Sequence, residues 1–144
     1  MSTDYVIPAF YFSVNWGEGD MNFTEVSGLT MEAEPIEYRE GLDPVFTVQK
    51  IPGLRKFGNI TLKRGVTTNA NDFFKWYDTQ RPGTVEKRNL TISLLNEAGE
   101  AALTWKMREA WVVKVEAPSF NAKDNEIAIE SMEIAHEGVV VEAA

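Results

Sequence analysis

The 144-residue sequence contains no cysteine and a single histidine, His136. Without cysteine the chain has no disulfide framework, no thiol nucleophile and no thiolate metal site. A single histidine removes most zinc sites and most histidine-dependent catalysis. The sequence also lacks any run of about 18 apolar residues, which would be needed for a membrane-spanning helix. Residues 1–8 show no basic segment leading into an apolar run, as a Sec signal peptide would. The sequence therefore predicts a protein that is made and kept in the cytoplasm without a membrane anchor.

Basic residues are also scarce, with 14 lysines and arginines against 22 acidic residues, for a net charge of −8. This balance argues against specific nucleic-acid binding, because phosphates require a basic surface. The charge is unevenly spread, since residues 1–50 carry a net −7, residues 51–88 a net +5 and residues 89–144 a net −6. Bases of the middle block include Arg55, Lys56, Lys63 and Arg64. Such blocks either form an ordinary solvated surface or allow a basic patch on one copy of the chain to contact an acidic patch on the next copy.

Hydrophobic residues make up 44% of the chain, and most of them alternate with polar ones. A period of two places apolar side chains on one face of a β-strand. It occurs in residues 10–16, 60–62, 90–95 and 103–108. Asn96–Gly99 has the composition of a hairpin turn between the last two of these runs. We therefore expect about eight short strands in one domain that covers residues 1–144, a length that can bury a substantial core.

One segment breaks the strand pattern, because residues 68–80 have helical spacing. Phe73, Trp76 and Tyr77 stand at i, i+3 and i+4, which predicts one apolar helix face that packs on the core. Asn69 or Asn71 suits the start of this helix, and Arg81 and the proline after it end it. The predicted fold class is mainly β, an antiparallel sandwich or barrel with one short α-helix that covers an open end.

Two irregular regions carry further expectations. Residues 41–53 contain glycines and prolines around the strand-like residues 45–48, which predicts a loop or the tip of a hairpin. Near the end of the chain, Ile127 and Ile129 share one phase of the alternation, whereas Met132 and Ile134 share the other. A β-bulge or bend at residues 130–131 would reconcile the two phases.

Candidate chemistry is sparse. Glu32 and Glu34 point to the same side of a predicted strand, and paired carboxylates hydrolyse glycosides in many enzymes. Acid pairs on a solvated strand face are much commoner, however, and no residues nearby mark a pocket. The spacing of Asp20, Asn22 and Glu25 matches no calcium loop. The sequence predicts neither an enzyme nor a bound cofactor or metal.

Several segments, taken in order, resemble the tail tube proteins of contractile phages and related contractile injection systems. They are FYFSVNW (10–16), FTEVSGLTMEAEPIEYREG (23–41), IPGLRKFGNITLKRGV (51–66), RNLTISLLNEAGEAALTWKMREAW (88–111) and FNAKDNEIAIESMEIAHEGV (120–139). The block at 51–66 is the most specific, because the family carries a similar PGL, G and LKRGV pattern there. No single block is decisive, and the order and spacing carry the resemblance.

The resemblance implies a hexameric ring in which two β-hairpins from each subunit join neighbouring subunits into one continuous inner β-barrel. Rings would stack head to tail into a tube inside a contractile sheath, starting at a baseplate or hub. The lumen would carry DNA or effector proteins as cargo. After cytoplasmic assembly, the tube would be part of a phage tail or injection particle, which could be released from the cell.

The resemblance also implies roles for two sets of residues, one in contacts between rings and one in the lining of the lumen. The expected ring-to-ring contact consists of Gly41, Leu42, Asp43, Pro44, Val45, Phe46, Arg55 and Lys56. The strands at 31–40, 57–63 and 103–115 are candidates for the inner barrel, where polar faces would line a wet lumen. Lumen-facing candidates are Glu32, Glu34, Thr61 and Lys63.

Two alternatives remain open at this point. The first is a tube-initiator or baseplate paralogue of the same fold. The second is a stand-alone β-sandwich that binds a glycan or protein through an exposed platform of its four tryptophans. That platform is disfavoured, because the positions of the tryptophans fit core or sheet faces.

Overall fold

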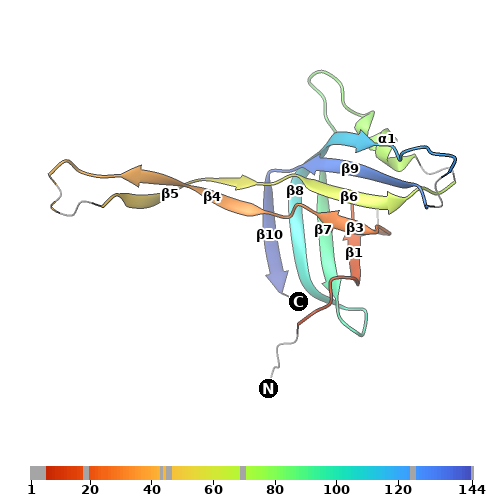
Figure 1. The fold of residues 1–144 in the computed structure, drawn as a ribbon, viewed down its shortest axis with the longest axis horizontal. Helices are drawn as coiled ribbons and strands as arrows, with labels where there is room; N and C mark the ends of the chain where they lie inside the picture. The colour runs from red at the N-terminus through yellow and green to blue at the C-terminus, as the bar shows by residue number, and fades with distance from the viewer. Residues whose placement is uncertain are drawn as a thin grey trace.

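Two antiparallel sheets that share one long strand form the body of the protein in the computed structural model (Figure 1). The structure describes residues 6–17, 20–42, 44, 47–68, 71–123 and 126–143. Sheet A contains β1 (Phe12–Asn15), β2 (Asp20–Met21), β7 (Arg88–Leu95), β10 (Gly138–Ala143) and the first half of β8 (Ala101–Glu116). Sheet B contains β3 (Glu25–Ser27), β6 (Ile60–Gly65), β9 (Ile129–Ala135) and the second half of β8. A separate two-stranded sheet is made by β4 (Met31–Tyr38) and β5 (Gln49–Phe57).

The shared strand β8 changes sheet at Glu109. Residues 103–108 of β8 pair with β10 and residues 101–110 with β7, whereas residues 111–116 pair with β9. Glu109 has a φ of 54°, which non-glycine residues seldom adopt, and its N–H donates to Asn89 Oδ1 at 3.3 Å. The strands of the two sheets consequently run in crossing directions in Figure 1.

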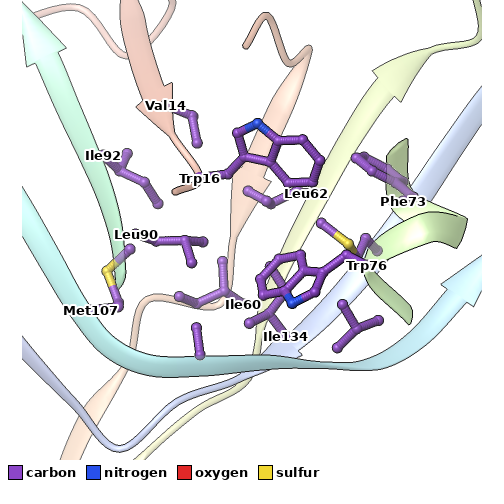
Figure 2. Packing of buried hydrophobic residues seen from close by; sticks show 13 residues of the cluster. Val14, Trp16, Ile60, Leu62, Phe73, Trp76, Leu90, Ile92, Met107 and Ile134 are labelled. Atoms are coloured by element: carbon purple, nitrogen blue, oxygen red, sulfur yellow. The ribbon is translucent and has the colours of Figure 1, made fainter. Parts of the chain in front are cut away.

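The core lies between the two sheets and is closed by the helix α1 (Asp72–Tyr77). Phe73 and Trp76 of this helix are buried, and both rings meet Trp16 edge to face, at centroid distances of 6.4 and 5.9 Å (Figure 2). Leu90 and Met107 of sheet A and Leu62 of sheet B are fully buried among them. The predicted fold class, with its one short helix, is thus confirmed.

Two arginines lie beside these aromatic rings, of which Arg64 is buried and Arg88 is partly buried. Arg64 is 6% exposed, and its guanidinium lies 4.0 Å from the centre of the Phe73 ring. Its Nε is 2.6 Å from Glu130 Oε1, so the buried positive charge is compensated by a carboxylate as well as by the ring. Arg88 lies over the rings of Trp16 and Trp76, at 4.8 and 4.5 Å. Both cations therefore help to fix the helix against the sheets.

Some expectations need correction. The predicted bulge at residues 130–131 is wrong, because β9 pairs with β6 in one uninterrupted register. Glu130, Met132 and Ile134 share the inward face, and Glu130 is tolerated there because it meets Arg64. Ile127 and Ile129 are exposed instead. The bulge lies in β8, between Val112 and Lys114.

The helix and the first strand are shorter than predicted. The helix spans only Asp72–Tyr77, with no side-chain cap from Asn71, and Tyr77 is exposed rather than in the core. Asn69 lies outside the described residues. Phe10 is exposed as well, because β1 begins at Phe12. The part of the chain that the structure describes contains ten strands, where about eight were expected.

The two aromatic faces of α1 allow a matched test of the core. Trp76→Ala removes a fully buried ring, so we expect the free energy of unfolding to fall by about 3–5 kcal/mol. Phe74→Ala on the exposed side of the same helix should change it by less than about 0.5 kcal/mol. Urea unfolding followed by tryptophan fluorescence and circular dichroism measures both. Equal losses would show that the helix is not a core element.

Candidate functional site

An arm made of β4 and β5 projects from the body and is the most unusual surface of the molecule (Figure 1). Within the part of the chain that the structure describes, these two strands pair only with each other. All eight residues of β4 are exposed, and in β5 only Gly53 and Phe57 are partly covered. Because both strands have a free outer edge, the arm carries unpaired backbone groups on its two sides.

The arm continues the paired strands β3 and β6 at the edge of sheet B. The segment where the arm leaves this sheet, its root, is tightly packed. At the root, Gly28 has a φ of +90°, and a Cβ there would stand 2.1 Å from the carbonyl oxygen of Asn59. A Cβ on Gly58 would be equally close to Thr30 Oγ1. Backbone hydrogen bonds join Thr30 to both glycines, at 2.8 and 3.1 Å. Only glycines allow the two chain segments to approach this closely.

The single histidine supports the same root. His136 Nε2 lies 3.0 Å from the carbonyl oxygen of Gly58, to which a ring N–H can donate. Its ring also packs on Phe57, with 5.8 Å between the ring centroids. The contacts of His136 are therefore structural ones, between the last residues of sheet B and the base of the arm.

The two strands of the arm carry opposite charge. β4 contains Glu32, Glu34 and Glu37 and no base, whereas β5 contains Lys50, Arg55 and Lys56 and no acid. Glu32 stands opposite Lys56 and Glu37 opposite Lys50, and Lys56 Nζ is 3.3 Å from Glu34 Oε2. Exposed pairs of this kind contribute little to stability. The arm is thus a ribbon with an acidic side and a basic side.

The described residues among those expected to contact the next ring fall in two places. Arg55 and Lys56 lie in β5, whereas Gly41, Leu42 and Pro44 lie in the segment that joins β4 to β5 at the tip. Leu42 is 99% exposed. The remaining predicted contacts, Asp43, Val45 and Phe46, lie outside the described residues. The tip segment is shorter than expected, because residues 49–53 belong to β5.

The predicted lumen residues are divided between the arm and the body. Glu32 and Glu34 lie on the arm, whereas Thr61 and Lys63 lie in β6, on the face of sheet B turned away from the core. Lys63 pairs there with Glu25 at 3.2 Å. The other basic residue of this segment, Arg64, points inward to Glu130 and is not available for a contact between rings.

The outer face of sheet A is a second polar surface, which the lumen candidates did not include. Lys106 pairs there with Glu142 at 3.0 Å, and Ser93, which is only 8% exposed, has its Oγ 3.1 Å from Thr104 Oγ1. The signal was present in the sequence, as polar residues that alternate with Ile92 and Trp105 along β7 and β8.

Within the described residues, no group of three or more histidine, cysteine or acidic side chains is arranged to hold a metal ion. No helix in that part of the chain is long and apolar enough to span a membrane. A small sandwich with a long unpartnered arm has the features of a structural subunit that associates with other chains.

Comparisons with known proteins agree with this class. The family model described as T4-like virus tail tube protein gp19 matches residues 8–140. The structure resembles a chain in the sheath–tube complex of the extracellular contractile injection system PVC, in the extended state. That match has 35% sequence identity and a TM-score of 0.90, and it covers 98% of this chain and 94% of the other. A chain of the anti-feeding prophage (AFP) cap matches with 35% identity and a TM-score of 0.91, covering 100% and 95% of the two chains.

A more distant match to a solved structure shows similarity of fold only. Hcp1 from Flavobacterium johnsoniae is 14% identical, with a TM-score of 0.56, and the match covers 94% of this chain and 97% of that one. No curated protein sequence matches. The chain belongs to the family of T4-like virus tail tube proteins. It is a structural tube subunit, homologous to tube proteins of contractile injection systems, as the sequence predicted.

The root of the arm allows a second test with a matched control. Gly28→Ala places a Cβ against the Asn59 carbonyl oxygen at a positive φ, so we expect a loss of about 2 kcal/mol or more in the free energy of unfolding. Gly41→Ala at the tip meets nothing within 4 Å and should change it by less than about 0.5 kcal/mol. Urea unfolding compares the two variants, and a neutral Gly28→Ala would contradict the close approach at the root.

Proposed function

We propose that this chain is the main subunit of the inner tube of a contractile tail or injection particle, and that it acts as hexameric rings stacked into a hollow tube. The observation that carries this proposal is the exposed arm, which joins the body only through its root and has two free edges. A solitary protein gains nothing from such edges, whereas closure of several sheets into one barrel satisfies their backbone groups.

The tip of the arm would provide the contact between rings. Leu42 is almost fully exposed there, and Gly41 and Pro44 make the segment compatible with a turn at the end of a long hairpin. An apolar side chain at the far end of an arm is more stable in an apolar pocket of another copy than in water. Arg55 and Lys56 lie on the same arm, closer to the root.

The lumen would be lined by polar sheet faces. Glu32, Glu34, Thr61 and Lys63 are one set of candidates, and the outer face of sheet A is another. With a net charge of −8 on each copy, such a lumen would repel DNA and acidic cargo from its walls. DNA or effector proteins could then pass without binding.

The proposed partners follow from the relatives. One of them is found in a sheath–tube complex and another in a tube-terminating cap, so a sheath protein and a cap or baseplate protein are the expected neighbours of this tube. The chain would assemble in the cytoplasm and then form part of the particle. Its role would be structural, without catalysis.

A tube initiator of the same fold is the second candidate. A chain of the AFP baseplate has a similar fold, with a TM-score of 0.82 at 23% identity. The identity to the chain of the sheath–tube complex is higher, at 35%, which favours the main tube. A stand-alone binding module is disfavoured, because Trp16 and Trp76 are buried in the core.

Negative-stain electron microscopy of the purified chain tests the proposal directly. Rings or hollow rods are expected at high protein concentration. A particle that stays monomeric under all conditions would overturn the tube function and favour the binding module.

A shortened arm tests the contact between rings. Because Tyr38 pairs with Gln49, residues 39–48 can be replaced by Asn-Gly, a two-residue turn that keeps every strand pair of the arm. We expect normal unfolding and normal rings but no long tubes, as seen by electron microscopy. Leu42→Ser keeps the length of the tip, so it should shorten the tubes less than the Asn-Gly replacement does. Tubes of normal length from the Asn-Gly variant would refute a contact between rings through the tip.

A further inference from the structure

We propose that a proline pair, Pro35 of β4 and Pro52 of β5, protects the free chain from aggregation. The pair leaves both outer edges of the arm without a backbone donor at the same level. Strands of other free copies therefore cannot add to the arm one after another into fibrils. The protection acts on the single chain before any assembly, and it does not rest on the proposed function.

The arm needs protection because it combines free edges with exposed apolar side chains. Its two strands pair only with each other within the part of the chain that the structure describes. Ile36, Ile51 and Leu54 are exposed on them, and Leu54 is 80% exposed. A free edge of this kind is a template for further strands, and their repeated addition produces cross-β fibrils.

The direction of the two proline nitrogens follows from the pattern of an antiparallel ladder. Opposite residues alternate between pairs that exchange N–H···O bonds and pairs whose N–H and C=O groups point away from the partner strand. Pro35 stands opposite Pro52, and neither has an N–H to exchange. This pair is therefore of the second kind, and its two nitrogens point to the two outer edges of the arm.

The same alternation shows that the prolines cost the arm itself no ladder bond. Ile36 stands opposite Ile51 in the next pair, which is of the bonding kind, and Glu37 stands opposite Lys50 in a pair that again points outward. A proline at Ile36 or Ile51 would remove a bond between the two strands. At their actual positions the prolines remove only donors that another chain could use.

Two further features near the proline pair also oppose strand addition. The register of the arm shifts between Ala33 and Pro35, and such an irregularity interrupts a regular edge. Glu34 and Lys56 are exposed and lie 3.3 Å apart, so the same stretch carries charged side chains. Prolines, irregular registers and charges are the means by which natural edge strands avoid aggregation, and they occur together here.

A double substitution tests the protection by restoring a donor at each outer edge. The variant P35T/P52T does so with threonine, which favours strands and is polar, so it adds no large apolar side chain. Pro8→Thr is the matched control, because Pro8 is exposed and lies outside the strands of the structure. Urea unfolding before the experiment shows whether each variant has the wild-type fold.

The measurement is thioflavin T fluorescence of the purified full chains after incubation at equal concentration. Electron microscopy of the same samples distinguishes fibrils from regular rings or rods. For P35T/P52T we expect fibrils and a fluorescence about tenfold above that of the wild type. Pro8→Thr should stay within about twofold of the wild type, because it opens no strand edge.

A relocated pair separates the missing donors from other effects of proline. The variant P35T/E37P/K50P/P52T moves both prolines to the next pair that points outward. It removes one acid and one base, so the net charge stays at −8. Because each outer edge again lacks a donor, the fluorescence should return to within about twofold of the wild type.

The outcomes are decisive for the protection and separate from the proposed function. If P35T/P52T has the wild-type fold and forms no more fibrils than the wild type, the proposal is overturned. Fibrils from the relocated variant at the level of P35T/P52T also overturn it. If the double variant fails to fold, the single variants P35T and P52T decide, since each opens one edge, and no rise in fluorescence from either refutes the protection. The presence or absence of rings and rods bears on the proposed function alone.

Discussion

The strand β8 is the constraint on which the rest of the structure depends, because one continuous strand belongs to both sheets. Its first half pairs with β7 and β10, its second half pairs with β9, and the change occurs at Glu109 in a backbone conformation that is costly for a glutamate. The two sheets cannot slide or separate without breaking this strand. The core between them, the helix that closes it and the hairpin that carries the arm all take their positions from it.

The buried core and the free strand edges of the protein are located in different parts of the molecule. The body contains the buried residues, including the aromatic cluster around Trp16 and the two arginines that lie on its rings. The arm contains exposed residues, ion pairs that contribute little to the free energy of unfolding, and free strand edges. Among the described residues, the core cluster includes none from β4 or β5, and the glycines at the root of the arm fix where the arm leaves the body.

Sequence alone predicted the parts of the fold that depend on local alternation. Leu90 and Ile92 on one face of a strand, and Phe73 and Trp76 on one face of a helix, are examples. It could not show that β8 serves two sheets, because alternation does not say which strand lies alongside. It misplaced a bulge because Glu130 is charged yet faces inward, where Arg64, distant in sequence, compensates it. The arm was only partly foreseen, since charges and prolines interrupt the alternation of its strands.

The uneven charge along the chain gains a spatial meaning from the arm. The acidic first block of the sequence gives way to the basic block near residue 50, and this boundary falls within β5. Because a hairpin folds the chain back on itself, a change of sign along the sequence becomes a change of sign across the ribbon. Pairs within the arm neutralise part of the charge, but each outer edge still belongs to a strand of one sign. A monomer has no use for that polarity, whereas a ring of identical subunits requires each copy to present two different and complementary edges.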